Sequence, residues 1–380
     1  MLNRRSLRIK GMQAIFAYHT AREAEFNICK KEAEDHFLPD LNSMEVQDKE
    51  ELTKDRESTG KAFDALIHKG ADAIPEDTKP EIVKLIKAQQ QSYLNKLVAN
   101  KDHFKKRLLA GITSIYDDYI KFLYIVVEIQ ELIATEKRKK NNTHDNIAKN
   151  IVINKLKSFE ALEEERIRKN VAWDTDLIRA WYKEYIKPQE FFIEYDNLAK
   201  ANLEEDQEFV QTLYKSIIFK NDNINDYFEA LDLGWSENKP ILKSMVLKTA
   251  KSIESEESEP LLMELSKNWE EDLLFLKELY DLAIDQEEQY EKLIEEKSKN
   301  WEIDRVALTD RIILEMAIGE MIHFTSIPVK VTINEYIELS KLYSTPKSKQ
   351  FVNGLLDVLS VELQKDGQIK KSGRGLLDNK

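Results

Sequence analysis

Three arginines near the N-terminus, Arg4, Arg5 and Arg8, stand with Lys10 on one short segment of the chain. Arg and Lys side chains bind phosphate oxygens, and the positive end of a helix dipole strengthens that attraction. Residues 7–19 place apolar side chains at steps of three and four, which predicts a helix beginning beside these cations. We therefore predict that these four residues contact a nucleic acid, and that replacing the arginines leaves stability nearly unchanged.

The overall charge restricts what kind of nucleic-acid contact is feasible. The chain has 70 acidic and 57 basic residues, a formal net charge of −13. Such a field repels phosphates, which argues against a protein that coats nucleic acid nonspecifically. Any such contact must be local.

The sequence does not indicate an enzyme. The only close pair of glycines, Gly373 and Gly375, lies in a basic tail and makes no phosphate-binding loop. No G-x-S-x-G motif is present, and the six histidines lack metal-ligand spacing. His323, beside an expected helix end, is better explained as a core or cap residue. We predict no catalysis, no cofactor and no metal.

Cysteine use and hydropathy favour a cytoplasmic protein. Cys29 is the single cysteine, which fits a reducing compartment. The longest apolar stretch, 122–133, is broken by Glu128 and Glu131 and is too short to span a bilayer. Because no acid precedes Glu23, an amphipathic transit peptide stays an alternative reading of the N-terminus.

The sequence pattern predicts an all-α fold. With 10 glycines and 8 prolines in 380 residues, long helices are favoured over turn-rich β architectures. Residues 23–81 are polar and irregular, so we expect exposed helix and loop with little core. Residues 82–140 carry a broad apolar stripe typical of one or two long helices.

A segment starting at Glu205 lines up with one starting at Glu271, at a constant offset of 66 residues. The matched pairs include Phe209 with Phe275, Tyr214 with Tyr280, and Trp235 with Trp301. Because amphipathic helices share apolar positions by chance, this pattern suggests a duplication without establishing one.

The C-terminal third has distinct helix signals. Apolar residues between 308 and 322 predict a buried helix. Thr332 and Glu335 have capping-box spacing, which predicts that the next helix begins there. A last helix carries Leu355 in its core, and we expect close helix contact to compensate for Gly354 within it.

Three strings in this region, DRIILEMAIGE, IPVKVTINEYIELSK and KSKQFVNGLLD, resemble in order and spacing the C-terminal helices of the NusB family of transcription antitermination factors. The string RRSLRIKGMQAIFAY resembles that family's arginine-rich first helix. The resemblance covers about residues 1–20 and 261–365. It implies a NusB-like helical bundle of two packed helical subdomains, here with a long helical insertion after the first helix.

The resulting domain prediction has five parts. These are a basic N-terminal helix (1–25), the helical insertion (26–204), a helical subdomain that would be the degenerate repeat (205–260), the NusB-like C-terminal bundle (261–365) and a flexible basic tail (366–380).

The resemblance also implies a function. NusB proteins bind boxA, a short single-stranded RNA element, together with NusE, a small-subunit ribosomal protein, and help RNA polymerase resist termination on ribosomal RNA operons. By its match to the family's KFVNG stretch, Phe351, flanked by Lys347 and Lys349, is a candidate for stacking on an RNA base. The family pattern assigns Phe16 and Asp310 to the NusE-facing surface.

Each of these assignments has a plainer alternative. Phe351 has the spacing of a core residue relative to Leu355, and Asp310 has the spacing of an intrahelical pair. The alternative for the whole chain is a helical scaffold that binds no RNA and uses its insertion to dock proteins. The net charge favours this alternative, and the N-terminal arginines oppose it.

Overall fold

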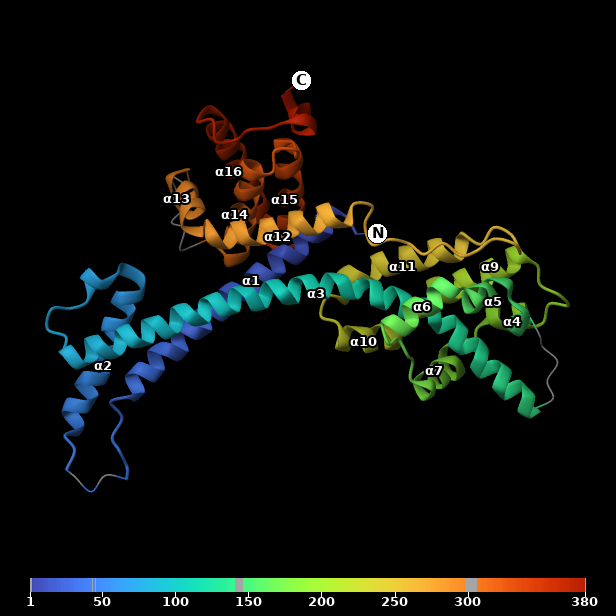
Figure 1. Cartoon of the computed structure of the whole chain (residues 1–380), viewed down its shortest axis with the longest axis horizontal. Coiled ribbons are helices and arrows are strands. Elements are labelled where there is room, and N and C mark those ends of the chain that lie inside the picture. The colour runs from blue at the N-terminus through green and yellow to red at the C-terminus, as the bar shows by residue number, and fades with distance from the viewer. Residues whose placement is uncertain (1, 43, 45, 141–145, 298–305, 380) are drawn as a thin grey trace. The chain divides into compact units, whose positions relative to one another are not determined.

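The computed structural model describes residues 2–42, 44, 46–140, 146–297 and 306–379, and these residues form helices without a β-strand (Figure 1). The prediction of an all-α fold is confirmed. The chain divides into two compact units. Unit 1 comprises Met1–Leu7 and Leu109–Leu273, and unit 2 comprises Arg8–Leu108 and Leu274–Lys380.

Three helices have residues in both units: α1 (Arg4–Asp35), α3 (Pro80–Lys140) and α12 (Trp269–Asp285). The other helical segments of unit 1 are α4 (Asn146–Lys149), α5 (Ile151–Ser158), α6 (Glu160–Arg168), α7 (Thr175–Trp181), η2 (Tyr182–Ile186), α8 (Glu190–Asp196), α9 (Leu203–Thr212), η3 (Leu213–Ile218), α10 (Asp222–Leu231) and α11 (Trp235–Lys251). Those of unit 2 are α2 (Lys49–Lys69), η1 (Ala71–Ala73), α13 (Glu287–Lys297), α14 (Leu308–His323), α15 (Val329–Tyr343), α16 (Pro346–Lys365) and η5 (Gly373–Asn379).

The units do not follow the predicted domain boundaries. The insertion 26–204 is divided inside α3, so its first part belongs to unit 2 and its second part to unit 1. A continuous helix gives no local sequence signal at such a point, because the residues on both sides continue the same periodic pattern.

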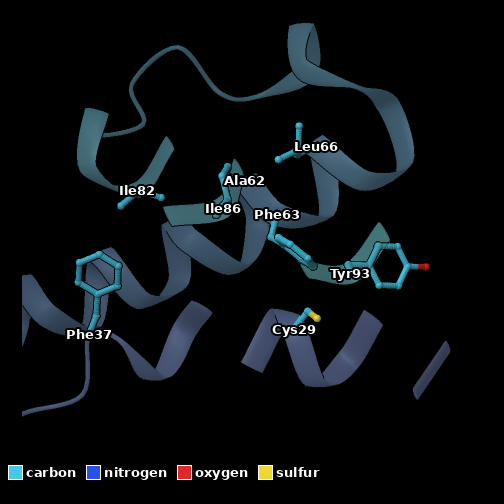
Figure 2. Close-up of a cluster of buried hydrophobic side chains, with 8 residues drawn as sticks. All are labelled: Cys29, Phe37, Ala62, Phe63, Leu66, Ile82, Ile86 and Tyr93. Atoms are coloured by element: carbon cyan, nitrogen blue, oxygen red, sulfur yellow. The ribbon is translucent and has the colours of Figure 1, made fainter. Parts of the chain in front are cut away.

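The start of the insertion has a core of its own, so the expectation of little core in residues 23–81 was wrong. Figure 2 shows the buried side chains of this core, which come from α1 and the residue shortly after it, from α2 and from α3. They are Cys29, Phe37, Ala62, Phe63, Leu66, Ile82, Ile86 and Tyr93. Apolar residues are sparse in α2, but Ala62, Phe63 and Leu66 are all buried.

The described helices support an internal duplication at the offset of 66 residues. When 66 is added to the residue numbers of α10, the helix spans 288–297, which nearly coincides with α13 (Glu287–Lys297). The segment 203–218, shifted in the same way, spans 269–284 and nearly coincides with α12 (Trp269–Asp285). In unit 1, Tyr214 donates a hydrogen bond to the carbonyl of Phe122 on α3 (2.8 Å). In unit 2, Tyr280 donates one to the carbonyl of Lys101 on the same helix (3.0 Å). The predicted partner of Trp235, Trp301, lies outside the described residues.

Helices α14, α15 and α16 pack against one another, with Leu355 of α16 buried as predicted. Two details differ from the sequence reading. Helix α15 begins at Val329 after Pro328, so Thr332 lies inside it and is no cap. Gly354 is exposed, and a methyl group placed on it would meet nothing within 4 Å, so close helix contact does not explain this glycine.

The tail, expected to be flexible, docks on unit 2. Ile369 is buried, and the Lys371 ammonium donates to the carbonyl of Phe324 (2.9 Å). The amide of Ser372 donates to the carbonyl of Thr325 (3.0 Å).

Candidate nucleic-acid interface

Arg8 is buried, with 2% of its surface exposed, and is held by Glu320 of α14, which is completely buried. Its Nε and Nη2 atoms donate to the two carboxylate oxygens, each at 2.7 Å. Burial alone would lower the pKa of Arg8, but the charge and hydrogen bonds of Glu320 outweigh it and raise that pKa above its usual value. A guanidinium held in this way cannot reach a phosphate, so Arg8 is removed from the predicted RNA contacts.

The surroundings of this ion pair complete a buried polar network. Thr332 and Tyr336 of α15 donate to the Glu320 carboxylate at 2.8 and 3.2 Å. The guanidinium carbon of Arg8 lies 5.4 Å from the ring centre of Phe275 and 5.8 Å from that of Tyr336. Sequence reasoning missed this network, although an arginine on the buried face of an amphipathic helix is a signal for such a partner.

The other N-terminal cations differ in their surroundings. Arg4 forms ion pairs with Glu271 and with Asp272, and its side chain is 30% exposed. Arg5 is exposed, and Lys10 is half-buried. The four predicted cations therefore do not form one open patch.

The beginning of α16 has the features of an anion-binding helix end. Thr345 caps the helix by accepting a hydrogen bond from the amide of Ser348, and Pro346 occupies the first turn. Lys347 and Lys349 are exposed, and this first turn contains no acidic residue. The positive end of the helix dipole therefore adds to the charge of two lysines.

Phe351 lies on the next turn of α16 and is half-buried. It is neither fully enclosed, as the core alternative requires, nor fully open. Part of this side chain is therefore accessible to solvent.

The two residues assigned to a protein partner differ. Phe16 of α1 is 42% exposed, which is high for a large apolar side chain and suits a contact surface. Asp310 of α14 is only 4% exposed, and its Oδ1 atom has no hydrogen-bond partner among the described residues. The assignment of Asp310 to a partner surface is therefore corrected, because its carboxylate faces the interior.

Within the described ranges, no helix combines the length and the apolar character needed to cross a bilayer.

Comparison with known proteins identifies the C-terminal region. The family model described as NusB family matches residues 240–360, which include α14, α15 and most of α16 but not the N-terminal arginines. No solved structure matches the chain.

Three relatives are each described as a transcription antitermination protein NusB. The protein of Chloroherpeton thalassium is 49% identical over 74 residues, which is 20% of this chain and 35% of that protein. The protein of Salinibacter ruber is 45% identical over 73 residues, or 19% of this chain and 46% of that protein. This chain thus matches less than half the length of either of these two relatives.

The protein of Dictyoglomus turgidum is 36% identical over 105 residues, which is 28% of this chain and 71% of that protein. This match extends over most of that protein, and the family model matches the C-terminal region of this chain, residues 240–360. The chain belongs to the NusB family.

Proposed function

We propose that this chain is an RNA-binding transcription antitermination factor, which binds boxA-type single-stranded RNA together with NusE in the RNA polymerase antitermination complex. It would support transcription of ribosomal RNA operons in the cytoplasm and perform no catalysis. Family membership supports the class of function, since the three relatives are transcription antitermination proteins. The observation that carries the RNA proposal is the exposed pair Lys347 and Lys349 at the start of α16.

The beginning of α16 offers both parts of a single-strand site. Exposed lysines and the positive end of the helix dipole attract phosphate, while an aromatic ring close to them in the sequence can stack on a base. Phe351 follows Lys349 by two residues, and its partial exposure is compatible with stacking. On a molecule of net charge −13, a contact this small binds only locally.

The N-terminal cations have a reduced part in this proposal. Arg5 and Lys10 stay proposed RNA contacts. Arg4 is a weaker candidate, because a phosphate would have to compete with Glu271 and Asp272.

For the protein partner, Phe16 is the proposed contact residue. Its exposed ring lies on α1, and burial of such a surface against NusE would be favourable.

A helical scaffold that binds no RNA is the second candidate. The observation in its favour is that carboxylates already hold Arg4 and Arg8, which leaves less free positive charge than the sequence suggested.

Filter binding of a boxA-like RNA by the full chain, with and without NusE, distinguishes the two functions. The RNA proposal predicts binding that weakens steeply as salt increases, with a slope of about −0.7 in log–log form for each phosphate contact. An equal-length RNA of scrambled sequence is the control. Absence of binding at low salt, even with NusE present, would favour the scaffold.

A further inference from the structure

A group of three carboxylates lies in unit 2, on α13 and α14. Glu287 and Glu291 come from α13, and Glu315 comes from α14. One oxygen of each carboxylate lies within 4.8 Å of the others. Glu315 is completely buried, whereas the other two are half-buried. An acidic group alone does not identify a ligand, so its neighbours decide what it can hold.

The first neighbour is His19 of α1, which is 4% exposed. Its Nδ1 atom lies 3.6 Å from Oε1 of Glu287, and neither ring nitrogen has a hydrogen-bond partner in the described part of the chain. Burial lowers the pKa of His19 to about 4, with the charge of Glu287 opposing that shift. Because neither nitrogen is used by a described residue, the imidazole has a nitrogen available for a ligand.

Glu315 is the second group that lacks a partner. Both its oxygens are buried without a hydrogen bond from any described residue, and Nε of Arg311 lies 3.8 Å away. A buried polar atom left without a partner costs roughly 1–3 kcal/mol, and an unpaired charge costs more. His19 lies 3.6 Å from one oxygen of Glu287, and an oxygen of Glu315 lies within 4.8 Å of Glu287. The two groups that lack partners are therefore both beside Glu287, which a shared ligand would explain.

The charges nearby leave one carboxylate uncompensated. Arg22 holds both oxygens of Glu287, at 2.5 and 2.8 Å. Arg311 lies 3.0 Å from an oxygen of Glu291. Two guanidinium groups therefore offset two of the three carboxylates. A carboxylate has lone pairs beyond those used by an arginine, so such pairing is compatible with metal ligation and orients the ligand.

The distances in this group can be compared with those of ligands on one ion. Zinc binds nitrogen and oxygen at about 2.0–2.2 Å, so two atoms on the same ion lie at most about 4.4 Å apart. The separation of 3.6 Å between His19 and Glu287 meets this limit. Four ligands placed tetrahedrally on zinc lie about 3.3–3.6 Å apart. The three carboxylate oxygens, up to 4.8 Å apart, and His19, which is not in their group, would therefore have to move closer as the ion binds.

We propose that His19, Glu287, Glu291 and Glu315 bind one divalent transition-metal ion, with Zn²⁺ preferred over Mg²⁺. An imidazole ligand favours zinc, whereas magnesium selects oxygen ligands and retains its waters. Because the ligands come from α1, α13 and α14, the ion would stabilise the packing of these helices.

The test is calorimetric titration of the chelator-treated full chain with ZnCl₂ and, separately, with MgCl₂. The expected result is about one zinc ion per chain, zinc binding at least about tenfold tighter than magnesium, and a higher melting temperature with zinc. Glu315→Gln is expected to weaken zinc binding by about tenfold or more. His19→Gln is a second variant, whose fold is checked by circular dichroism. Glu288→Gln, on the exposed face of α13, is the matched control and is expected to bind zinc like the wild type.

Three results would overturn the proposal. One is the absence of stoichiometric zinc binding by the folded wild type, and another is full binding by both folded ligand variants. The third is a Glu315→Gln variant that melts above the wild type while neither binds zinc, which would show that a proton neutralises Glu315.

Discussion

Arg8 and Glu320 form a buried ion pair between residues 312 positions apart in the chain, with two hydrogen bonds of 2.7 Å between them. The pair joins α1 to α14, and Thr332 and Tyr336 bind the same carboxylate from α15. The first helix of the chain is therefore tied to the C-terminal bundle by an arginine that sequence reasoning had assigned to RNA.

Replacing Arg8 by alanine should destabilise the protein. The change leaves the completely buried Glu320 without its cation, and breaking a buried pair from one side costs roughly 3–5 kcal/mol. Urea denaturation followed by circular dichroism measures the loss. Arg5→Ala is the matched control, because Arg5 is exposed on the same helix, and it should shift stability by less than about 1 kcal/mol. Equal stability of the two variants would contradict the structural role of Arg8.

Replacing Leu355 by alanine should also destabilise the protein, through a cavity in α16. Leu355 is 6% exposed, and truncation of a buried leucine costs roughly 2–5 kcal/mol. Val361 lies on the same helix but is 66% exposed, so Val361→Ala should have little effect in the same denaturation experiment. A negligible shift for Leu355→Ala would show that this face of α16 is not core.

Replacing Gly354 by alanine should stabilise the protein. This glycine lies in the interior of α16, and an added methyl group meets nothing within 4 Å. Alanine is favoured over glycine in a helix by about 0.8–1 kcal/mol. Gly11 on α1 is the contrasting site, because a methyl group there lies 3.3 Å from Leu276. A melting temperature lowered by Gly354→Ala would indicate that the residue needs conformational freedom.

Asp118 on α3 should make stability depend on pH. Burial, with a smaller contribution from Asp232 and opposed by Lys121, raises the pKa of Asp118 to about 6. In the unfolded chain an aspartate titrates near about 3.9. Between these two pH values the folded state binds more protons than the unfolded chain. The contribution of protonated Asp118 to the free energy of unfolding is therefore complete below about pH 4 and is lost as pH rises through about 6.

The variant Asp118→Asn removes this dependence, since an amide is neutral at every pH. Its stability relative to the wild type should increase from pH 4 to 7 and then level off, by about 3 kcal/mol at most. Urea denaturation at a series of pH values measures this difference. Asp226→Asn, at an exposed position of α10, is the control variant measured in parallel. A difference independent of pH would contradict the titration of Asp118 in this range.

Sequence periodicity predicted the helices well because each amphipathic pattern is local. The long apolar stripe of 82–140 became α3, and the buried helix near 308–322 became α14. The family strings identified the C-terminal bundle because they preserve both residue type and spacing. The N-terminal helix was expected as well, since its apolar spacing begins next to the arginines.

The errors concern partners that lie far away in the sequence. The charge of Arg8 suggested that its side chain is exposed to solvent. Its partner, Glu320, lies more than 300 residues later in the chain, and no local sequence pattern links the two. The assignment of Asp310 to a partner surface was wrong for the same reason, because the burial of Asp310 depends on which helices cover α14. Thr332 had the correct spacing for a helix cap, but the helix begins earlier, at Val329 after Pro328. The Thr332 hydroxyl instead donates a hydrogen bond to Glu320.

The most direct test of the proposed RNA function is filter binding of a boxA-like RNA, across a salt series, by Lys347→Ala/Lys349→Ala and by the control Lys365→Ala. Lys365 is exposed at the opposite end of α16, so it shares the helix but not the proposed site. If the two lysines contact phosphates, the double variant binds more weakly, with a salt slope reduced by about 1.4, and the control is unchanged. Wild-type affinity and slope in the folded double variant would contradict these contacts.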